Sequence, residues 1–309
     1  MQPLDGIHHV TAITANAPQN LAFYTGVLGL RLLKKSVNQD DPSVYHLFYG
    51  DEAASPGSDL TFFEYLSAAR GRAGDGMIHR IAFRVGSPSA LDFWQSRLQS
   101  ASIHSDRTDD SLAFQDPEGL GLELLAQPSA DAPLVASHPE IPTQHALQGF
   151  AGVRAYSSLP DLSRPLLEST LGFAPSLADA FAISGASRSS FYAYDPAPSS
   201  PSRPGAGTVH HVAFASTLED HPAWRQVLLQ AHAYPSPIID RFYFRSIYFR
   251  EPSGVLFELA TLGPGFTVDE SLEHLGEHIS LPPPLEHLRS QIEPHLTPLP
   301  NPRAAWPAA

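Results

Sequence analysis

Residues 6–13 read GIHHVTAI, and a similar stretch returns at residues 208–216 as TVHHVAFAS. Both alternate apolar and polar side chains over a short run, which predicts a β-strand that carries two adjacent histidines. Weaker copies without the histidine pair appear as MIHRIAFRV at 77–85 and FAGVRAYS at 150–157. Self-similarity of this kind indicates repeated structural units, and we expect four of them, each opening with such a strand.

The four units share one order of elements. A helix-like segment follows each first strand, with Asn16 as the predicted N-cap in unit one and Ser87, followed by Pro88, in unit two. Two or three strand-like runs then complete each unit. At the ends of units two and four, DPEGLGLELL (116–125) aligns without a gap on EPSGVLFELA (251–260), and both contain a hairpin turn signal. Each unit therefore reads as strand, helix and about three strands, over about fifty to sixty residues.

Changes in composition divide the chain. A Pro- and Ala-rich stretch without periodicity separates units two and three, as expected of a linker. We predict an α+β protein of two similar domains, with units one and two in 1–128, a linker at 129–148, units three and four in 149–264, and a Pro-rich tail at 265–309. One helix is expected within the tail, over residues 284–296.

Composition excludes several classes of function. The 309 residues contain 19 Lys and Arg against 32 Asp and Glu, and the resulting net charge of −13 argues against binding to nucleic acid or to an anionic membrane surface. No cysteine is present, so disulfides, thiolate metal sites and a cysteine nucleophile are excluded. The opening residues lack the pattern of a secretory leader, and no apolar run is long enough to span a membrane. We expect a cytoplasmic protein, and homo-oligomerisation is compatible with the sequence.

The aligned units place chemically distinctive residues at equivalent positions. On the first strands the aligned residues are His9, Arg80, Gly152 and His211, in unit order. On the last strands of units one, two and four they are Glu64, Glu123 and Glu258. If units one and four pack together, His9, His211 and Glu258 form a two-histidine, one-carboxylate triad of the kind that holds non-haem Fe(II). On spacing alone, these residues are either a metal site or unrelated histidine pairs and a strand-end acid.

Strand geometry assigns different roles to the two histidines of each pair. Successive side chains of a regular strand point to opposite faces. His9 therefore shares a face with Thr11, and His8 is expected on the other face. The same alternation separates His210 from His211.

The repeats resemble the vicinal-oxygen-chelate superfamily, which includes glyoxalase I, bleomycin-resistance proteins and extradiol dioxygenases. Within it, LRLLKKSVNQDDPSVYHLFYGD (30–51), SPGSDLTFFEY (55–65) and DESLEHLGEHISLPPPLEHLR (269–289) look like the bacterial dioxygenases that cleave the ring of hydroquinones. The resemblance covers nearly the whole chain. It implies curved, barrel-like mixed sheets built from four βαβββ units. It also implies an Fe(II)-dependent enzyme that cleaves a substituted hydroquinone or related phenol with O2, with Mn, Zn or Ni as bound substitutes.

The resemblance also assigns residues. The iron ligands of those enzymes fall on His9, His211 and Glu258, the set reached from the repeats. Their other catalytic residues match His8, His210, Arg241 and Tyr248, and a pocket-lining residue matches Thr11. Without the resemblance, Arg241 would read as a solvated strand arginine and Tyr248 as a packed aromatic side chain.

Two other functions remain open at this stage. A four-ligand site that includes Glu64 would be similar to glyoxalase I, a Zn- or Ni-dependent isomerase. A slip of one residue in the strand register would turn that side chain away, leaving an acid that faces solvent. The second alternative is a non-enzymatic protein that binds an aromatic compound, as bleomycin-resistance proteins do. Such proteins can do without the metal residues, so the intact His–His–Glu set argues against this alternative.

Overall fold

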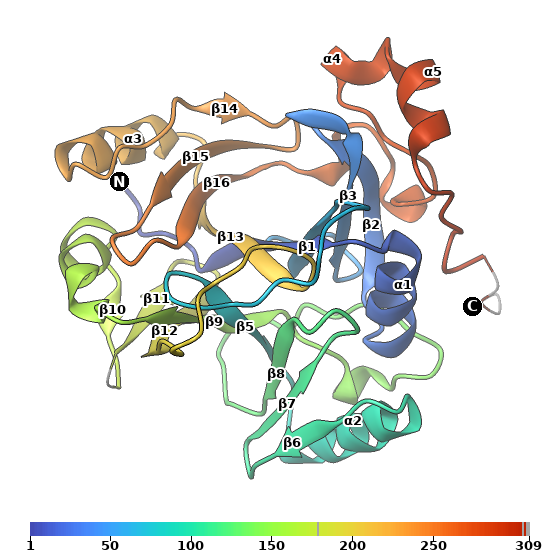
Figure 1. The fold of residues 1–309 in the computed structure, drawn as a ribbon, viewed down its shortest axis with the longest axis horizontal. Coiled ribbons are helices and arrows are strands. Elements are labelled where there is room, and N and C mark those ends of the chain that lie inside the picture. The colour runs from blue at the N-terminus through green and yellow to red at the C-terminus, as the bar shows by residue number, and fades with distance from the viewer. Residues whose placement is uncertain (178, 305, 307–309) are drawn as a thin grey trace.

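The two strands that carry the histidine pairs, β1 (Ile7–Thr14) and β13 (Thr208–Ser216), lie next to one another in the middle of one sheet. They run antiparallel, as Figure 1 shows in a computed structural model that describes residues 1–177, 179–304 and 306. Units one and four, at opposite ends of the sequence, are therefore joined edge to edge. The last positions of the predicted tail, residues 305 and 307–309, lie outside the described residues.

All four units show the predicted order of strand, helical segment and three strands. Unit one contains β1, α1 (Ala17–Leu21) with a π-helical turn (Ala22–Val27), β2 (Arg31–Asn38), β3 (Asp41–Gly50) and β4 (Asp59–Glu64). Unit two contains β5 (Ile78–Arg84), α2 (Pro88–Ser100), β6 (Ser105–Arg107), β7 (Ser111–Gln115) and β8 (Gly121–Leu125). Unit three contains β9 (Phe150–Ser157), a 3-10 turn (Pro160–Leu162), a π-helical turn (Pro165–Thr170), β10 (Ala174–Pro175), β11 (Ala180–Ser184) and β12 (Ser189–Pro196). Unit four contains β13, α3 (His221–Gln230), β14 (Ile239–Asp240), β15 (Phe244–Arg250) and β16 (Leu256–Pro264).

The strands form two eight-stranded mixed sheets, which confirms the α+β class. The first sheet joins units four and one in the order β14-β15-β16-β13-β1-β4-β3-β2, and it curls around a concave face (Figure 1). The second joins units three and two in the order β10-β11-β12-β9-β5-β8-β7-β6. Each sheet takes one unit from each half of the chain. The division into sequence domains at 128 and 149 therefore cuts across both sheets, and it stays a prediction.

Hydrogen bonds within each unit explain the local structure. The side chain of Asn16 accepts from the backbone N–H of Gln19 at 3.0 Å, and that of Ser87 from the N–H of Ala90 at 3.3 Å, so both predicted caps are confirmed. At the aligned turns of units two and four, Asp116 and Glu251 each accept two backbone N–H groups of their own turn. A buried carboxylate thus holds the same turn in both units.

Alternation along the strands separates the core from the concave face. Val10 and Ala12 of β1 belong to the main hydrophobic core, which also takes apolar side chains from α2 and α3. His9 and Thr11, which alternate with Val10 and Ala12 along β1, lie on the concave face. This face is where the first sheet can hold a polar site without interrupting the core.

The tail crosses the outer strand of the first sheet. It contains 3-10 turns, α4 (Pro283–Glu286) and α5 (Arg289–Ile292), with a further 3-10 turn at Glu293–His295. The single helix predicted over 284–296 is therefore wrong. The helix is broken at His287 and Leu288, and it changes to a 3-10 turn where Pro294 lacks a backbone donor. Ile279 bridges to Lys35 of β2, which attaches the tail to the sheet. Among the described residues, none of the helices has the length and apolar character needed to cross a membrane.

Candidate metal centre and aromatic pocket

Each histidine pair sits at an irregularity in the pairing of β1 with β13. Along β1 the register passes from Ile7 to His9 and skips His8, and along β13 it passes over His210. A β-bulge adds one residue to a strand and re-aims the neighbouring side chains, and bulges are frequent beside active sites. The two bulges decide how the four imidazoles are arranged.

His9, His211 and Glu258 meet on the concave face. The ligand atoms of these three residues all lie within 4.8 Å of one another. Oε2 of Glu258 is 3.2 Å from Nε2 of His9 and 2.9 Å from Nε2 of His211. The two Nε2 atoms are 3.2 Å apart. The three side chains come from β1, β13 and β16, which are neighbours in the sheet although they span most of the sequence.

The surroundings of Glu258 fit a cation. The side chain is fully buried, and neither carboxylate oxygen has a well-oriented hydrogen-bond donor among the described residues. Burial alone would raise the pKa of Glu258, but the two neighbouring imidazoles lower it well below its usual value. The group is therefore a buried carboxylate facing two ring nitrogens, and such a charge is costly unless it is paired or coordinates a metal.

The first histidine of each pair contacts the second through the other ring nitrogen. Nδ1 of His8 is 2.9 Å from Nδ1 of His9, and Nδ1 of His210 is 2.7 Å from Nδ1 of His211. Burial, followed by the neighbouring histidine, lowers the pKa of His8 to about 3 and that of His210 to about 4, so both rings are neutral. The predicted separation of each pair onto opposite faces is wrong, because a bulge breaks the regular alternation at both places.

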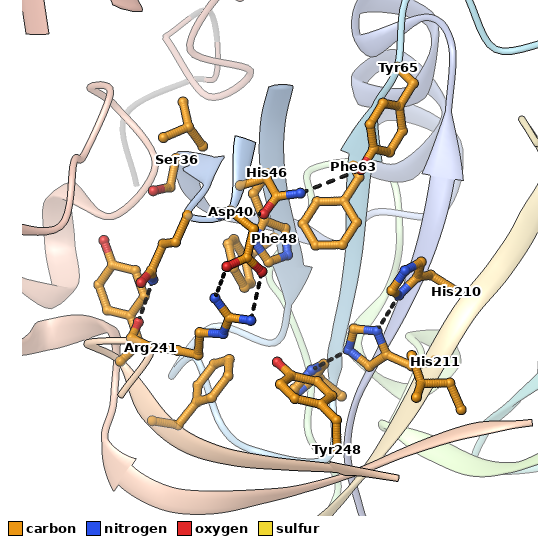
Figure 2. Close-up of a pocket in the computed structure, with 17 residues that line it drawn as sticks. Ser36, Asp40, His46, Phe48, Phe63, Tyr65, His210, His211, Arg241 and Tyr248 are labelled. Carbon is orange, nitrogen blue, oxygen red and sulfur yellow. Dashed lines mark hydrogen bonds and ion pairs between the residues drawn. The ribbon is translucent and has the colours of Figure 1, made fainter. Parts of the chain in front are cut away.

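A cavity of about 380 Å³ opens above the triad. His9, His210 and His211 line it on one side. Its walls include six aromatic side chains: Phe48, Phe63, Tyr65, Tyr243, Phe244 and Tyr248. Figure 2 shows His210 and His211 pointing toward one another on one side of this pocket, and Arg241 joined to Asp40 on the other. Aromatic walls with a few convergent polar groups are typical of a small-molecule site.

Tyr248 and Arg241, predicted as catalytic, both line this cavity. Tyr248 is paired with Glu258 across β15 and β16, and its ring centroid is 5.8 Å from that of His211. Burial and the charge of Glu258 raise the pKa of Tyr248, so the phenol keeps its proton. The guanidinium of Arg241 lies 5.5 Å from the centre of the Tyr248 ring and donates to both carboxylate oxygens of Asp40, at 3.1 and 2.8 Å.

Thr11 lies behind the residues that form the cavity wall. It is fully buried and is not among the residues that line the cavity. Its hydroxyl oxygen is 2.7 Å from that of Thr61, which is in turn 3.0 Å from Nε2 of His46. Its hydrogen bonds therefore reach the cavity through His46, and direct contact with a substrate stays a prediction.

Glu64 is turned away from the centre. Its carboxylate accepts from the backbone N–H of Ala17 at 2.7 Å, at the N-terminus of α1. It lies next to Phe63, which lines the cavity, and neighbouring side chains on a strand face opposite ways. The four-ligand arrangement weighed from the sequence thus has no support in the structure.

The second sheet does not repeat the centre at the aligned positions. Arg80 and Glu123 are 3.6 Å apart there and form an ion pair. Gly152, which takes the place of a histidine, lies against Phe191, where a larger side chain would clash. The described part of the chain therefore shows one such His–His–Glu group, on the first sheet.

Comparison with known proteins identifies the family of the chain. The family model described as Glyoxalase/Bleomycin resistance protein/Dioxygenase superfamily matches residues 6–124. The chain is 41% identical over 313 residues to "Putative ring-cleaving dioxygenase MhqA" of Bacillus subtilis, an alignment that covers 96% of this chain and 99% of that protein. The chain belongs to this superfamily. It is also 30% identical over 310 residues to "Chlorohydroquinone/hydroquinone 1,2-dioxygenase" of Sphingobium indicum, covering 94% and 95% of the two chains.

Solved structures of the superfamily show the same fold. A crystal structure titled as a putative dioxygenase from Bacillus subtilis superposes with a TM-score of 0.90 at 36% identity, covering 97% of this chain and 99% of that one. Glyoxalase I from Zea mays superposes with a TM-score of 0.59 at 15% identity, covering 88% and 97%, and at that distance it supports the fold alone.

Several residues of the pocket were not predicted from the sequence. His46, Phe48 and Phe63 line the cavity, and Asp40 holds Arg241 at its edge. Alternation in the stretch YHLFYG already puts His46 and Phe48 on one face of β3. What the sequence does not show is that this face curls toward β1 and β13.

Proposed function

We propose that this protein is an Fe(II)-dependent dioxygenase that cleaves the aromatic ring of a substituted hydroquinone or related phenol with O2. The observation that carries the proposal is the buried His9–His211–Glu258 group beneath an aromatic cavity. It occurs in a chain 41% identical, over nearly its full length, to a relative named as a ring-cleaving dioxygenase. A relative named as a hydroquinone dioxygenase supports the substrate class.

The donor set suits iron. Two imidazole nitrogens and one carboxylate oxygen supply three ligands and leave positions open for small molecules, which is typical of non-haem Fe(II) oxygenases. Nε2 of His9, Nε2 of His211 and the carboxylate of Glu258 would hold the ion. A bound Fe(II) would carry the substrate hydroxyl and dioxygen together and supply the redox chemistry. Mn, Zn or Ni would occupy the same ligands as substitutes.

The paired histidines set the orientation of the ligands. With Nε2 of His9 committed to a cation, its ring proton is on Nδ1 and donates to Nδ1 of His8. His210 accepts in the same way from His211. Partners of this kind fix the tautomer and the ring plane of a ligating histidine. His8 and His210 are therefore proposed to position the two imidazoles.

Tyr248 and Arg241 act on the substrate in this proposal. The protonated phenol of Tyr248 lies beside His211 and is placed to donate a hydrogen bond to a substrate oxygen held near the triad. Arg241, which Asp40 holds at the cavity wall, is proposed to stabilise negative charge that develops on the ring oxygens. The surrounding aromatic side chains bind the ring and exclude water, which strengthens both interactions.

The test begins with protein loaded anaerobically with Fe(II) and mixed with methylhydroquinone. On admission of air, we expect stoichiometric oxygen uptake together with a new absorbance of the ring-opened product. His9→Ala and Glu258→Ala should abolish both signals. Glu123→Gln, at the aligned position of the second sheet, is the matched control and should keep them. Tight iron binding without oxygen uptake from any hydroquinone would contradict the proposal.

A further inference from the structure

A histidine outside the metal centre faces the same cavity. His46 lies on β3, and its partly exposed ring lines the pocket. In the sheet order β16-β13-β1-β4-β3, the triad comes from the first three strands, and β3 is two strands beyond β1. Two strand spacings amount to about 10 Å. His46 lines the same cavity of about 380 Å³ as His9 and His211, and Figure 2 shows it together with Phe48 and Phe63 in that pocket.

The orientation of the His46 ring is fixed from three sides. Nε2 is 3.0 Å from the hydroxyl oxygen of Thr61, which is itself 2.7 Å from that of Thr11. The ring centroid is 4.0 Å from that of Phe48 and 4.4 Å from that of Phe63. An imidazole held by its faces and by one nitrogen has a single rotamer, so the direction of its second nitrogen is determined.

The second nitrogen, Nδ1, is left available for a ligand in the cavity that His46 lines. It has no hydrogen-bond partner among the described side chains, and it is not among their fully buried unpaired atoms. Burial lowers the pKa of His46 well below its usual value, so the ring is neutral. A neutral imidazole presents either an N–H or a lone pair at Nδ1, depending on how the Thr11 and Thr61 hydroxyls turn. A phenolic hydroxyl donates and accepts, and it is matched by either form.

Several other polar groups in the pocket have protein partners or lie at its triad end. Arg241 is bound to Asp40 through both of its terminal nitrogens. The hydroxyl of Tyr65 accepts from Asn38 at 3.4 Å. Tyr248 lies at the triad end of the cavity, beside His211. His46 is thus the group best placed to meet the far side of a ring whose first oxygen lies at the triad.

We propose that Nδ1 of His46 binds the second hydroxyl of the substrate, the one that the metal centre does not hold. This inference rests on the proposed function and deepens it, because it makes His46 the residue that selects a para-dihydroxy aromatic ring over a ring with one hydroxyl. Thr61, which contacts Thr11, positions the ring of His46 through its hydroxyl.

Binding measurements test the inference without relying on turnover. The probes are hydroquinone and 4-methylphenol, which have the same outline and differ in the second hydroxyl. Calorimetric titration of the anaerobic Fe(II)-loaded protein should show that hydroquinone binds about ten times more tightly than 4-methylphenol. One or two hydrogen bonds account for a difference in affinity of this size. Equal affinity of the unaltered protein for the two probes would overturn the inference.

Two variants separate substrate contact from a structural role. In His46→Asn, the side-chain amide takes the place of Nδ1. In His46→Gln, the amide takes the place of Nε2 and keeps the contact with Thr61. We expect His46→Asn to retain most of the preference for hydroquinone and His46→Gln to reduce it to within about twofold. The opposite order would show that the bond to Thr61 is what matters, and retention by both variants would show that His46 selects nothing.

Oxygen uptake keeps the two proposals apart. If hydroquinone binds preferentially and His46→Gln removes the preference, but no oxygen is consumed, then the dioxygenase function fails and the binding role of His46 stands. If oxygen is consumed and His46→Gln still prefers hydroquinone, the role of His46 fails and the dioxygenase function stands.

Discussion

Lys34 of β2 offers a quantitative test of how the tail is held. Its side chain is 0% exposed, and Nζ lies 2.7 Å from Oδ1 of Asp269 and in contact with Glu270. It also donates to the backbone carbonyl of Phe266 at 3.2 Å. One buried ammonium thus forms ion pairs with two carboxylates of the tail next to the cavity wall, where Tyr243 donates to the same Asp269 at 3.0 Å.

Lys34→Met removes the cation and leaves the two carboxylates close together. Loss of one partner of a buried ion pair costs about 3–5 kcal/mol. The carboxylates are 22% and 13% exposed, so water relieves part of this cost, and we expect about 3 kcal/mol. At about 2 °C per kcal/mol for a chain of this size, the thermal midpoint should fall by about 6 °C. Scanning calorimetry measures the midpoint, and trypsin cleavage after Arg289 or Arg303 reports whether the tail detaches first.

Two further variants make the reasoning refutable. Lys35→Met is the matched control, because Nζ of Lys35 donates only to backbone carbonyls, at 2.8 and 3.5 Å. It should cost about 1 kcal/mol. Adding Asp269→Asn and Glu270→Gln to Lys34→Met should recover more than half of the loss, since no unpaired charge remains. If the triple variant is no more stable than Lys34→Met, or if Lys35→Met is equally harmful, the ion-pair explanation is wrong.

Three other predictions follow from buried carboxylates. Burial raises the pKa of Asp116 from 3.8 to about 6, so its contribution to stability is complete below pH 3.8 and is lost as pH rises through 6. Between pH 4 and 7 the wild type should lose up to about 3 kcal/mol relative to Asp116→Asn, and a difference in unfolding free energy that is constant with pH would contradict this. Glu251→Ala should cost about 3 kcal/mol in denaturant unfolding, because the hydroxyl of Tyr194 and two backbone N–H groups lose their acceptor, and Glu251→Gln should cost less. Mn(II) at about one hundred times its dissociation constant should stabilise the wild type and Glu123→Gln by about 2.7 kcal/mol. Calorimetry should detect no such gain in Glu258→Gln, and an equal gain there would remove Glu258 from the ligand set.

The repeated pattern in the sequence was sufficient for the order of elements and for naming three residues, His9, His211 and Glu258, that the structure brings together. Alternation in GIHHVTAI and TVHHVAFAS predicted two equivalent strands, and the gap-free alignment at the ends of units two and four brought Glu258 into the same register. These are local features, because hydrophobic periodicity and turn residues act over a few neighbours. Composition added the constraint that a transition metal has only histidine and carboxylate to bind, since the chain has no cysteine.

Tertiary structure decided the rest, because it depends on contacts between residues far apart in the chain. Pairing of β1 with β13 created the bulges that turned His8 toward His9, against the alternation read from sequence. Folding of the sheet brought His46 into the same cavity as His9 and His211, and the tail enclosed Lys34. A one-dimensional pattern specifies which face of a strand a side chain occupies. Which other strand that face meets is set by the packing of the whole chain.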